Sequence, residues 1–138
     1  CRVVTSNGDV WNVFGDEYSV NPSLIPVSLE GSYSYHNHLP EETNYSFSED
    51  DLEFFLSKKQ MCSEASDDVY RYFMWRREDT LEISEGEAYH DFKKTLVRDV
   101  GQMAFEGKVN MDIDGNHETM KIMSRRYNFD YLREEKND

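Results

Sequence analysis

The period at which apolar residues recur changes several times along this chain, and these changes constrain the fold more than any other feature. Apolar and polar residues alternate in several short stretches, as on a β-strand with one buried face. In longer stretches, apolar residues recur every three or four positions, as on an amphipathic helix. The 138 residues are enough for one domain with its own core. We therefore expect a single α+β domain over residues 1–138, a mixed β-sheet flanked by helices.

The first half of the chain carries most of the strand signals. Residues 1–14 alternate around a Ser-Asn-Gly-Asp turn at 6–9, which predicts a β-hairpin. Residues 32–38 alternate and are rich in tyrosine, which predicts a strand that ends at two histidines. Residues 69–77 predict a further strand, with residues 80–83 as its hairpin partner.

Three segments carry helix signals. Ser48 followed by three acidic residues is a typical N-cap and first turn, and predicts a helix over residues 49–60. Apolar residues spaced by three and four predict the longest helix over 85–105. A loop is expected over 107–115, followed by a last helix from residue 116 or 117 that runs through Tyr127 to a frayed, charged end.

Composition excludes several functional classes. Fifteen Lys and Arg stand against 28 Asp and Glu, a formal net charge of −13, which repels phosphate backbones and anionic lipids. The apolar runs are far shorter than the roughly 20 residues that cross a bilayer. Nucleic acid and membrane partners are therefore not expected. The arginines among the aromatic residues of 70–77 are interpreted as one side of a two-faced strand rather than as a base-stacking surface.

Two histidines and an aspartate form the strongest candidate for a metal site. His36 and His38 flank one residue at the predicted strand end, so both side chains point to the same side of the sheet. Asp51 lies in the first turn of the following helix, from which a carboxylate can reach back to the strand end. Two histidines and a carboxylate are a typical ligand set of catalytic zinc, with a fourth position open for water.

A simpler interpretation of the same residues stays open. A His-x-His pair in a strand often faces solvent, and Ser-Glu-Asp-Asp is an ordinary helix start. The remaining histidines, His90 and His117, are predicted to be structural or surface residues rather than ligands. The two cysteines, Cys1 and Cys62, give no reason to expect a disulfide framework, and a reducing compartment is the default.

Residues 36–40 (His-Asn-His-Leu-Pro) and 46–52 (Ser-Phe-Ser-Glu-Asp-Asp-Leu) resemble a known signature. They are similar to the His-x-His-Pro and Ser-x-x-Asp motifs of the JAMM (JAB) metalloprotease-like superfamily. The RadC-like proteins and the C-terminal domains of phage Mu F-type head morphogenesis proteins are the most similar branches. In this chain Leu39 separates the second histidine from the proline, and the spacing from His38 to Asp51 is two residues longer than usual.

The resemblance implies a fold and a set of roles. It implies JAMM-like, cytidine-deaminase-like layering, with Zn²⁺ held by His36, His38 and Asp51 and with Ser48 bonded to the reaction's oxyanion. The superfamily's general-base glutamate lies several tens of residues before the histidines, at or before Cys1 in this chain. Glu17 is the best substitute, and the alternatives are a base in an upstream segment or a domain that has lost catalysis.

We therefore expect a zinc-dependent hydrolase domain of a phage or mobile-element protein that cleaves a peptide or isopeptide bond. The alternatives are a non-catalytic virion interaction domain of the head-morphogenesis type and a phage-borne toxin-type effector domain. The expected partner is a protein or peptide substrate, and the expected location is the bacterial host cytoplasm or the virion. The first residue is Cys rather than Met, which is consistent with the C-terminal part of a longer chain.

Overall fold

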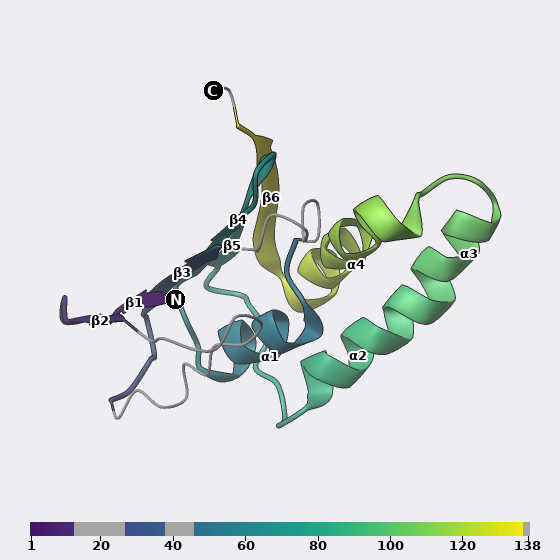
Figure 1. Cartoon of the computed structure of the whole chain (residues 1–138). Coiled ribbons are helices and arrows are strands. Elements are labelled where there is room, and N and C mark those ends of the chain that lie inside the picture. The colour runs from purple at the N-terminus through teal and green to yellow at the C-terminus, as the bar shows by residue number, and fades with distance from the viewer. Residues whose placement is uncertain (13–26, 38–45, 137–138) are drawn as a thin grey trace.

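The computed structural model describes residues 1–12, 27–37 and 46–136. They form one six-stranded mixed sheet with helices on a single side of it, as Figure 1 shows with the sheet close to edge-on. The strand order is β2-β1-β3-β4-β5-β6, in which only β3 and β4 pair in parallel. The predicted α+β class with a mixed sheet is confirmed.

The predicted N-terminal hairpin is present. Strands β1 (Arg2–Val4) and β2 (Val10–Asn12) pair antiparallel. Their turn includes Gly8 at φ +92°, a backbone conformation that favours glycine. Strand β3 (Tyr33–Asn37) pairs with the other edge of β1, which confirms the predicted strand as far as residue 37. His38 lies outside the described residues.

Helix α1 (Glu49–Ser57) is the crossover that joins β3 to β4 (Cys62–Ser66). The predicted helix is confirmed, although it ends three residues before the predicted residue 60. Strand β4 has the sequence Cys-Ser-Glu-Ala-Ser, which carries no apolar alternation and was not predicted. Four of its five residues are buried, because neighbouring strands flank it on both edges.

Strand β5 (Tyr70–Arg76) confirms the strand predicted over 69–77, but its predicted hairpin partner is wrong. The two edges of β5 are occupied by β4 and by β6 (Phe129–Glu135). Residues 80–83 form a loop instead, anchored where the Thr80 hydroxyl donates to the Asn128 carbonyl at 2.6 Å. The predicted frayed helix end is also wrong, because that segment is β6.

The helix predicted over residues 85–105 is confirmed, except that a π-helical turn interrupts it in the middle. It consists of α2 (Glu87–Thr95), a π-helical turn η3 (Leu96–Val100) and α3 (Gly101–Phe105). Phe92, Leu96 and Val100 are spaced by four. In a regular α-helix, a side chain four positions further on points about 40° away from the first, measured around the helix axis. The wider π turn reduces this drift, so that Phe92 and Val100 are both fully buried.

Helix α4 (Met111–Tyr127) begins earlier than predicted, so the loop expected over 107–115 is only partly correct. The Asn110 side chain caps it by accepting from the Asp112 N–H at 3.0 Å. Gly115 lies inside the helix, where α4 passes the π turn. A Cβ at residue 115 would lie 3.4 Å from Leu96 Cδ1.

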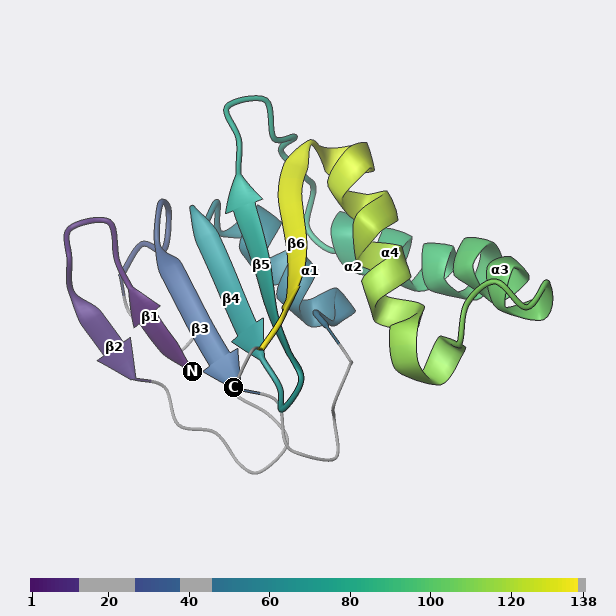
Figure 2. The same cartoon turned by 90° about the horizontal axis from the view of Figure 1, so that it is seen from above.

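The main core lies between the helices and one face of the sheet. Figure 2 shows this layering from above, with α1 and α2 behind the strands and α4 beside β6. The side chains from the helices, from β5 and β6, and from the segment before α1 bury each other, chiefly Phe47, Leu52, Phe55, Tyr72, Met74, Phe92, Met120, Met123 and Phe129. No helix in the described part of the chain is both long and apolar enough to cross a membrane.

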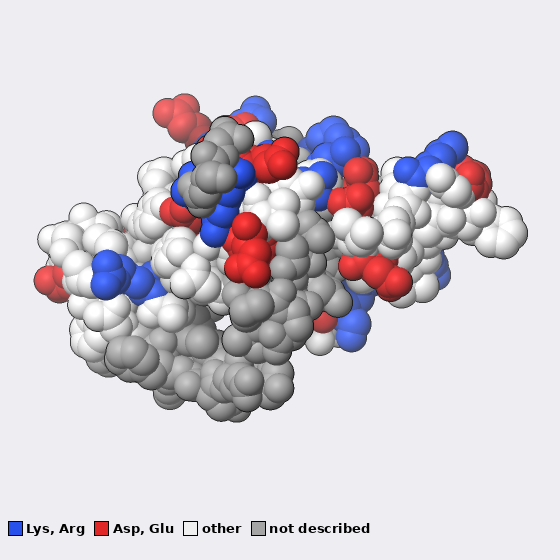
Figure 3. Space-filling model, turned by 45° about the horizontal axis from the view of Figure 1, so that its top comes forward, with Lys and Arg blue, Asp and Glu red and all other residues white. Residues whose placement is uncertain are grey.

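The opposite face of the sheet has no helix against it in the described residues. Phe73 and Trp75 stack there with ring centroids 5.0 Å apart and planes within 7°. Arg71 lies on this same face, whereas Arg76 lies on the helix side, so the prediction that the aromatic rings and their arginine neighbours lie on opposite faces holds only for Arg76. Figure 3 shows Lys and Arg interspersed with Asp and Glu on the face in view, rather than gathered into one basic patch among the described residues.

The burial pattern of the long helix predicts a contrast between two phenylalanines. Phe92 is fully buried and Phe105 is 88% exposed. We expect Phe92→Ala to lower the free energy of unfolding by about 3–5 kcal/mol, because it leaves a cavity in the core. Phe105→Ala is the matched control and is expected to change it by less than about 0.5 kcal/mol. Urea denaturation followed by circular dichroism measures both, and equal losses would contradict the burial assigned to Phe92.

Candidate metal site

His36 projects from β3 toward the helices, close to the carboxyl end of the strand. In the sheet register it lies beside Ala65 of β4, which in turn lies beside Tyr72 of β5. The His36 side chain is 23% exposed, so the ring lies at the boundary between core and solvent. The alternating pattern of residues 32–38 predicts His36 near the end of this strand, and the structure places it there.

Asp51 is held in place by the helix that carries it. Ser48 is the N-cap of α1, and its Oγ accepts from the Asp51 N–H at 3.3 Å. Asp51 Oδ2 in turn accepts from the Ser48 N–H at 2.9 Å and from the Ser48 hydroxyl at 3.1 Å. This reciprocal capping box fixes both the start of the helix and the orientation of the carboxylate.

The fold brings these two predicted ligands together across 15 positions of sequence. His36 Nε2 and Asp51 Oδ2 are 3.8 Å apart. Two ligand atoms on one tetrahedral zinc, with bonds of about 2.0–2.1 Å, are about 3.3 Å apart, so an adjustment of about half an ångström allows shared coordination. The third predicted ligand, His38, and the predicted base, Glu17, lie outside the described residues. Within those residues, no three His, Cys, Asp or Glu side chains cluster closely enough to hold a metal.

The first turn of α1 concentrates negative charge beside His36. Glu49, Asp50 and Asp51 follow each other directly. Burial raises the pKa of the Asp50 carboxyl, and repulsion from Glu49 and Asp51 raises it further. A cation bound at Asp51 would relieve this repulsion.

Phe47 lies on the buried side of the candidate metal site. It is fully buried, and its ring meets the His36 ring edge-on with centroids 6.4 Å apart. It makes similar edge contacts with Tyr72 at 6.3 Å and Tyr131 at 6.4 Å. The histidine ring thus has a rigid aromatic neighbour on its buried side.

A buried polar chain lies behind Phe47. The Tyr131 hydroxyl is 2.6 Å from Ser46 Oγ and 2.7 Å from His117 Nδ1. Burial lowers the pKa of His117 to about 4, and the nearby cations of Arg133 and Lys121 lower it further against the opposing effect of Glu118 and Asp114. His117 is therefore neutral at pH 7, which agrees with its predicted structural role.

Sequence reasoning missed Ser46, Phe47 and Tyr131 as parts of this region. Tyr131 was assigned to a frayed helix end, although Phe129, Tyr131 and Arg133 alternate with charged or exposed residues as in a strand. Ser46 gives no sequence signal, because its role depends on a tyrosine 85 residues away.

Ser48 lies beside the site as predicted, but its hydroxyl is already engaged. The Ser48 hydroxyl proton points to Asp51 Oδ2. A serine hydroxyl has one proton to donate, so the predicted bond to an oxyanion requires Ser48 to release Asp51 first.

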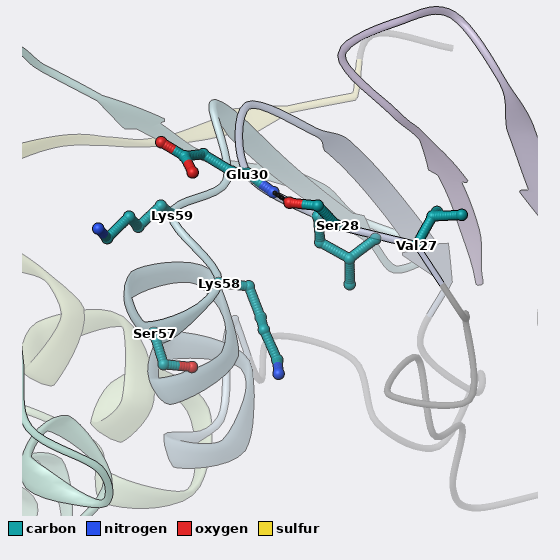
Figure 4. Close-up of a pocket in the computed structure, with 7 residues that line it drawn as sticks. Val27, Ser28, Glu30, Ser57, Lys58 and Lys59 are labelled. Atoms are coloured by element: carbon teal, nitrogen blue, oxygen red, sulfur yellow. Dashed lines mark hydrogen bonds between the residues drawn. The ribbon is translucent and has the colours of Figure 1, made fainter.

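A surface hollow at the other end of α1 is a separate feature. It has a volume of about 350 Å³ and lies at the carboxyl end of α1, as Figure 4 shows, with Lys58, Lys59, Ser28 and Glu30 among the residues that line it. Asp51 lies at the other end of this helix, about 10 Å away along its axis. The hollow is therefore not part of the candidate metal site.

Comparisons with protein-family models, curated proteins and solved structures find no match to this chain.

The buried His117 predicts a loss of stability in acid. The unfolded chain binds a proton at its histidines near pH 6.5, whereas folded His117 binds one only near pH 4. The contribution of neutral His117 to the free energy of unfolding is therefore complete above pH 6.5. As the pH falls toward 4, it is lost, by an amount on the order of 2–3 kcal/mol. Urea denaturation of the wild type and of His117→Gln at several pH values measures it. Plotted against pH, the free energies of unfolding of the two proteins should converge or cross as the pH falls. Parallel plots would refute the low pKa of His117.

Proposed function

We propose that this chain is a zinc-dependent hydrolase domain that cleaves a peptide or isopeptide bond. In this proposal His36, His38 and Asp51 hold the metal. The observation that carries it is the convergence of His36 Nε2 and Asp51 Oδ2 to 3.8 Å from two separate elements. The motif resemblance selects the same residues, and the hydrolase class rests on that resemblance.

The donor set fits zinc in its chemistry. Imidazole nitrogen and carboxylate oxygen are both common zinc ligands. The Asp51 carboxylate is oriented by two hydrogen bonds from Ser48, as ligating carboxylates usually are by a partner outside the coordination sphere. When bound, zinc would polarise the substrate carbonyl and lower the pKa of a water molecule to about 7.

The chain's own residues have distinct roles in this proposal. Phe47 supports the His36 ring and excludes water from its buried side. Ser48 orients Asp51, and its hydroxyl becomes available to an oxyanion if Asp51 turns toward the metal. Glu17 is the proposed general base, a role that a glutamate outside this sequence would fill equally well.

A second candidate function is a non-catalytic interaction domain of a phage particle. The capping box favours it, because the capping box accounts for Ser48 and Asp51 without any metal. In that case His36 and Asp51 would form a weak ion pair, about a quarter exposed, when the histidine is protonated. Metal binding separates the two candidates.

The proposal predicts one zinc per chain. Inductively coupled plasma mass spectrometry on protein dialysed after incubation with zinc should give a stoichiometry near one, and His36→Ala should lose the metal. The matched control is His90→Ala, which removes an exposed histidine on α2 and should retain the zinc. Circular dichroism should show both variants folded, because His36 lies at the edge of the core and His90 is exposed.

Two results would contradict the hydrolase proposal. Wild-type protein without zinc after this treatment would leave the interaction domain as the better account. Equal loss of zinc from His36→Ala and His90→Ala would show non-specific binding by an acidic surface.

A further inference from the structure

We infer that Tyr131 is a positioning residue: together with His117 and Ser46 it fixes the segment over residues 46–51 that carries the proposed ligand Asp51. The observation behind this inference is the continuous polar chain from α4 through β6 to the start of α1. The part that concerns zinc rests on the proposed function, whereas the positioning of the segment does not.

Ser46 needs an external hold because its backbone is in an unfavourable conformation. Its φ is +57°, in the left-handed region that residues other than glycine rarely adopt. Such a conformation persists only where the surrounding structure over-determines it. Ser46 is 1% exposed, and its hydroxyl bonds Tyr131 at 2.6 Å. Tyr131 therefore holds the segment at the residue whose backbone is in the left-handed conformation.

Tyr131 contacts the segment at a second point. Its ring meets the Phe47 ring edge-on with centroids 6.4 Å apart. Phe47 lies between Ser46 and the N-cap Ser48, and its ring also meets the His36 ring edge-on. Tyr131 thus positions both sides of the proposed site. It acts on Asp51 by fixing the backbone at Ser46, and on His36 by contacting Phe47.

His117 fixes the Tyr131 hydroxyl. The phenol stays protonated because burial raises its pKa, and His117 stays neutral at pH 7. A neutral imidazole nitrogen and a phenol form one directed hydrogen bond, which leaves the second position of the Tyr131 oxygen for Ser46. The three side chains come from α4, β6 and the segment before α1. The position of that segment, and with it of Asp51, therefore depends on how α4 packs on β6.

The chain offers a matched control for removing the Tyr131 hydroxyl. Tyr127 is buried at the end of α4, whereas Tyr131 is partly buried, and the Tyr127 hydroxyl donates to Asp91 Oδ2 at 2.8 Å. Tyr131→Phe and Tyr127→Phe each remove one hydrogen-bonded hydroxyl and keep the ring. We expect a similar loss of global stability from both variants.

The test is residue-resolved amide hydrogen exchange by nuclear magnetic resonance. The Ser48 and Asp51 amides report on the segment directly, because each donates within the capping box. In Tyr131→Phe we expect both to exchange at least about fivefold faster than in the wild type through local opening. In Tyr127→Phe they should stay within about twofold of the wild type. Ser46→Ala removes the other partner and should reproduce the effect of Tyr131→Phe.

Zinc competition titrations give the second measurement. Tyr131→Phe should bind zinc about tenfold more weakly than the wild type, as is typical when groups that orient metal ligands are removed. Tyr127→Phe should bind with wild-type affinity. Equal exchange at Ser48 and Asp51 in the two tyrosine variants would overturn the inference. A wild type that binds no zinc would refute the proposed function alone, and the exchange contrast would still decide the role of Tyr131.

Discussion

The complete burial of Phe47 is the constraint on which the rest of this region depends. Its ring contacts side chains from three strands, His36 of β3, Tyr72 of β5 and Tyr131 of β6. These strands are not all adjacent, so only a side chain standing over the sheet can connect them. With Phe47 in place, Ser46 reaches Tyr131 behind it and Ser48 begins α1 in front of it. The start of α1 is thereby tied to the sheet, and Asp51 to His36.

The parts of the fold that could be predicted from sequence are those with local causes. The hairpin of β1 and β2 follows from its turn residues, and α1 follows from the cap at Ser48. Strand β4 could not be predicted, because burial between two neighbours, rather than an apolar sequence, makes Cys62–Ser66 a strand. Strand β6 carries four charged residues in seven and resembles a helix end, but pairing with β5 decides its conformation.

The same distinction applies to the site. His36 and Asp51 were found because the spacing of histidines along a strand and of acids after an N-cap are properties of the local sequence. Tyr131 and His117 could not be assigned to the region, because Tyr131 bonds Ser46 only once β6 has folded back over 85 positions, and His117 reaches the region only through Tyr131. Residues that could serve as metal ligands are visible in a sequence, whereas the residues that orient them depend on the tertiary fold.

Some of the acidic side chains that give the chain its negative charge accept hydrogen bonds within the fold. Asp67 accepts from the Val69 and Tyr70 N–H groups and from the Tyr72 hydroxyl, so it builds the turn between β4 and β5. Asp91 accepts from Tyr127 and pairs with Arg126 at 2.5 Å, which joins α2 to α4. These carboxylates act through hydrogen bonds rather than through long-range charge, and each is already supplied with donors.

Asp51 differs from these carboxylates in its electrostatic surroundings. The amino end of a helix carries about half a positive charge, which by itself disfavours a cation there. Three consecutive carboxylates in the first turn of α1 more than offset it, and repulsion from Glu49 and Asp51 adds to the effect of burial in raising the pKa of Asp50. A divalent cation between Asp51 and His36 would relieve this repulsion, and the bond from the Ser48 N–H would orient the carboxylate. The amino end of α1 is therefore stable as a helix cap without metal and electrostatically suited to a metal, and both proposed functions are compatible with the same local structure.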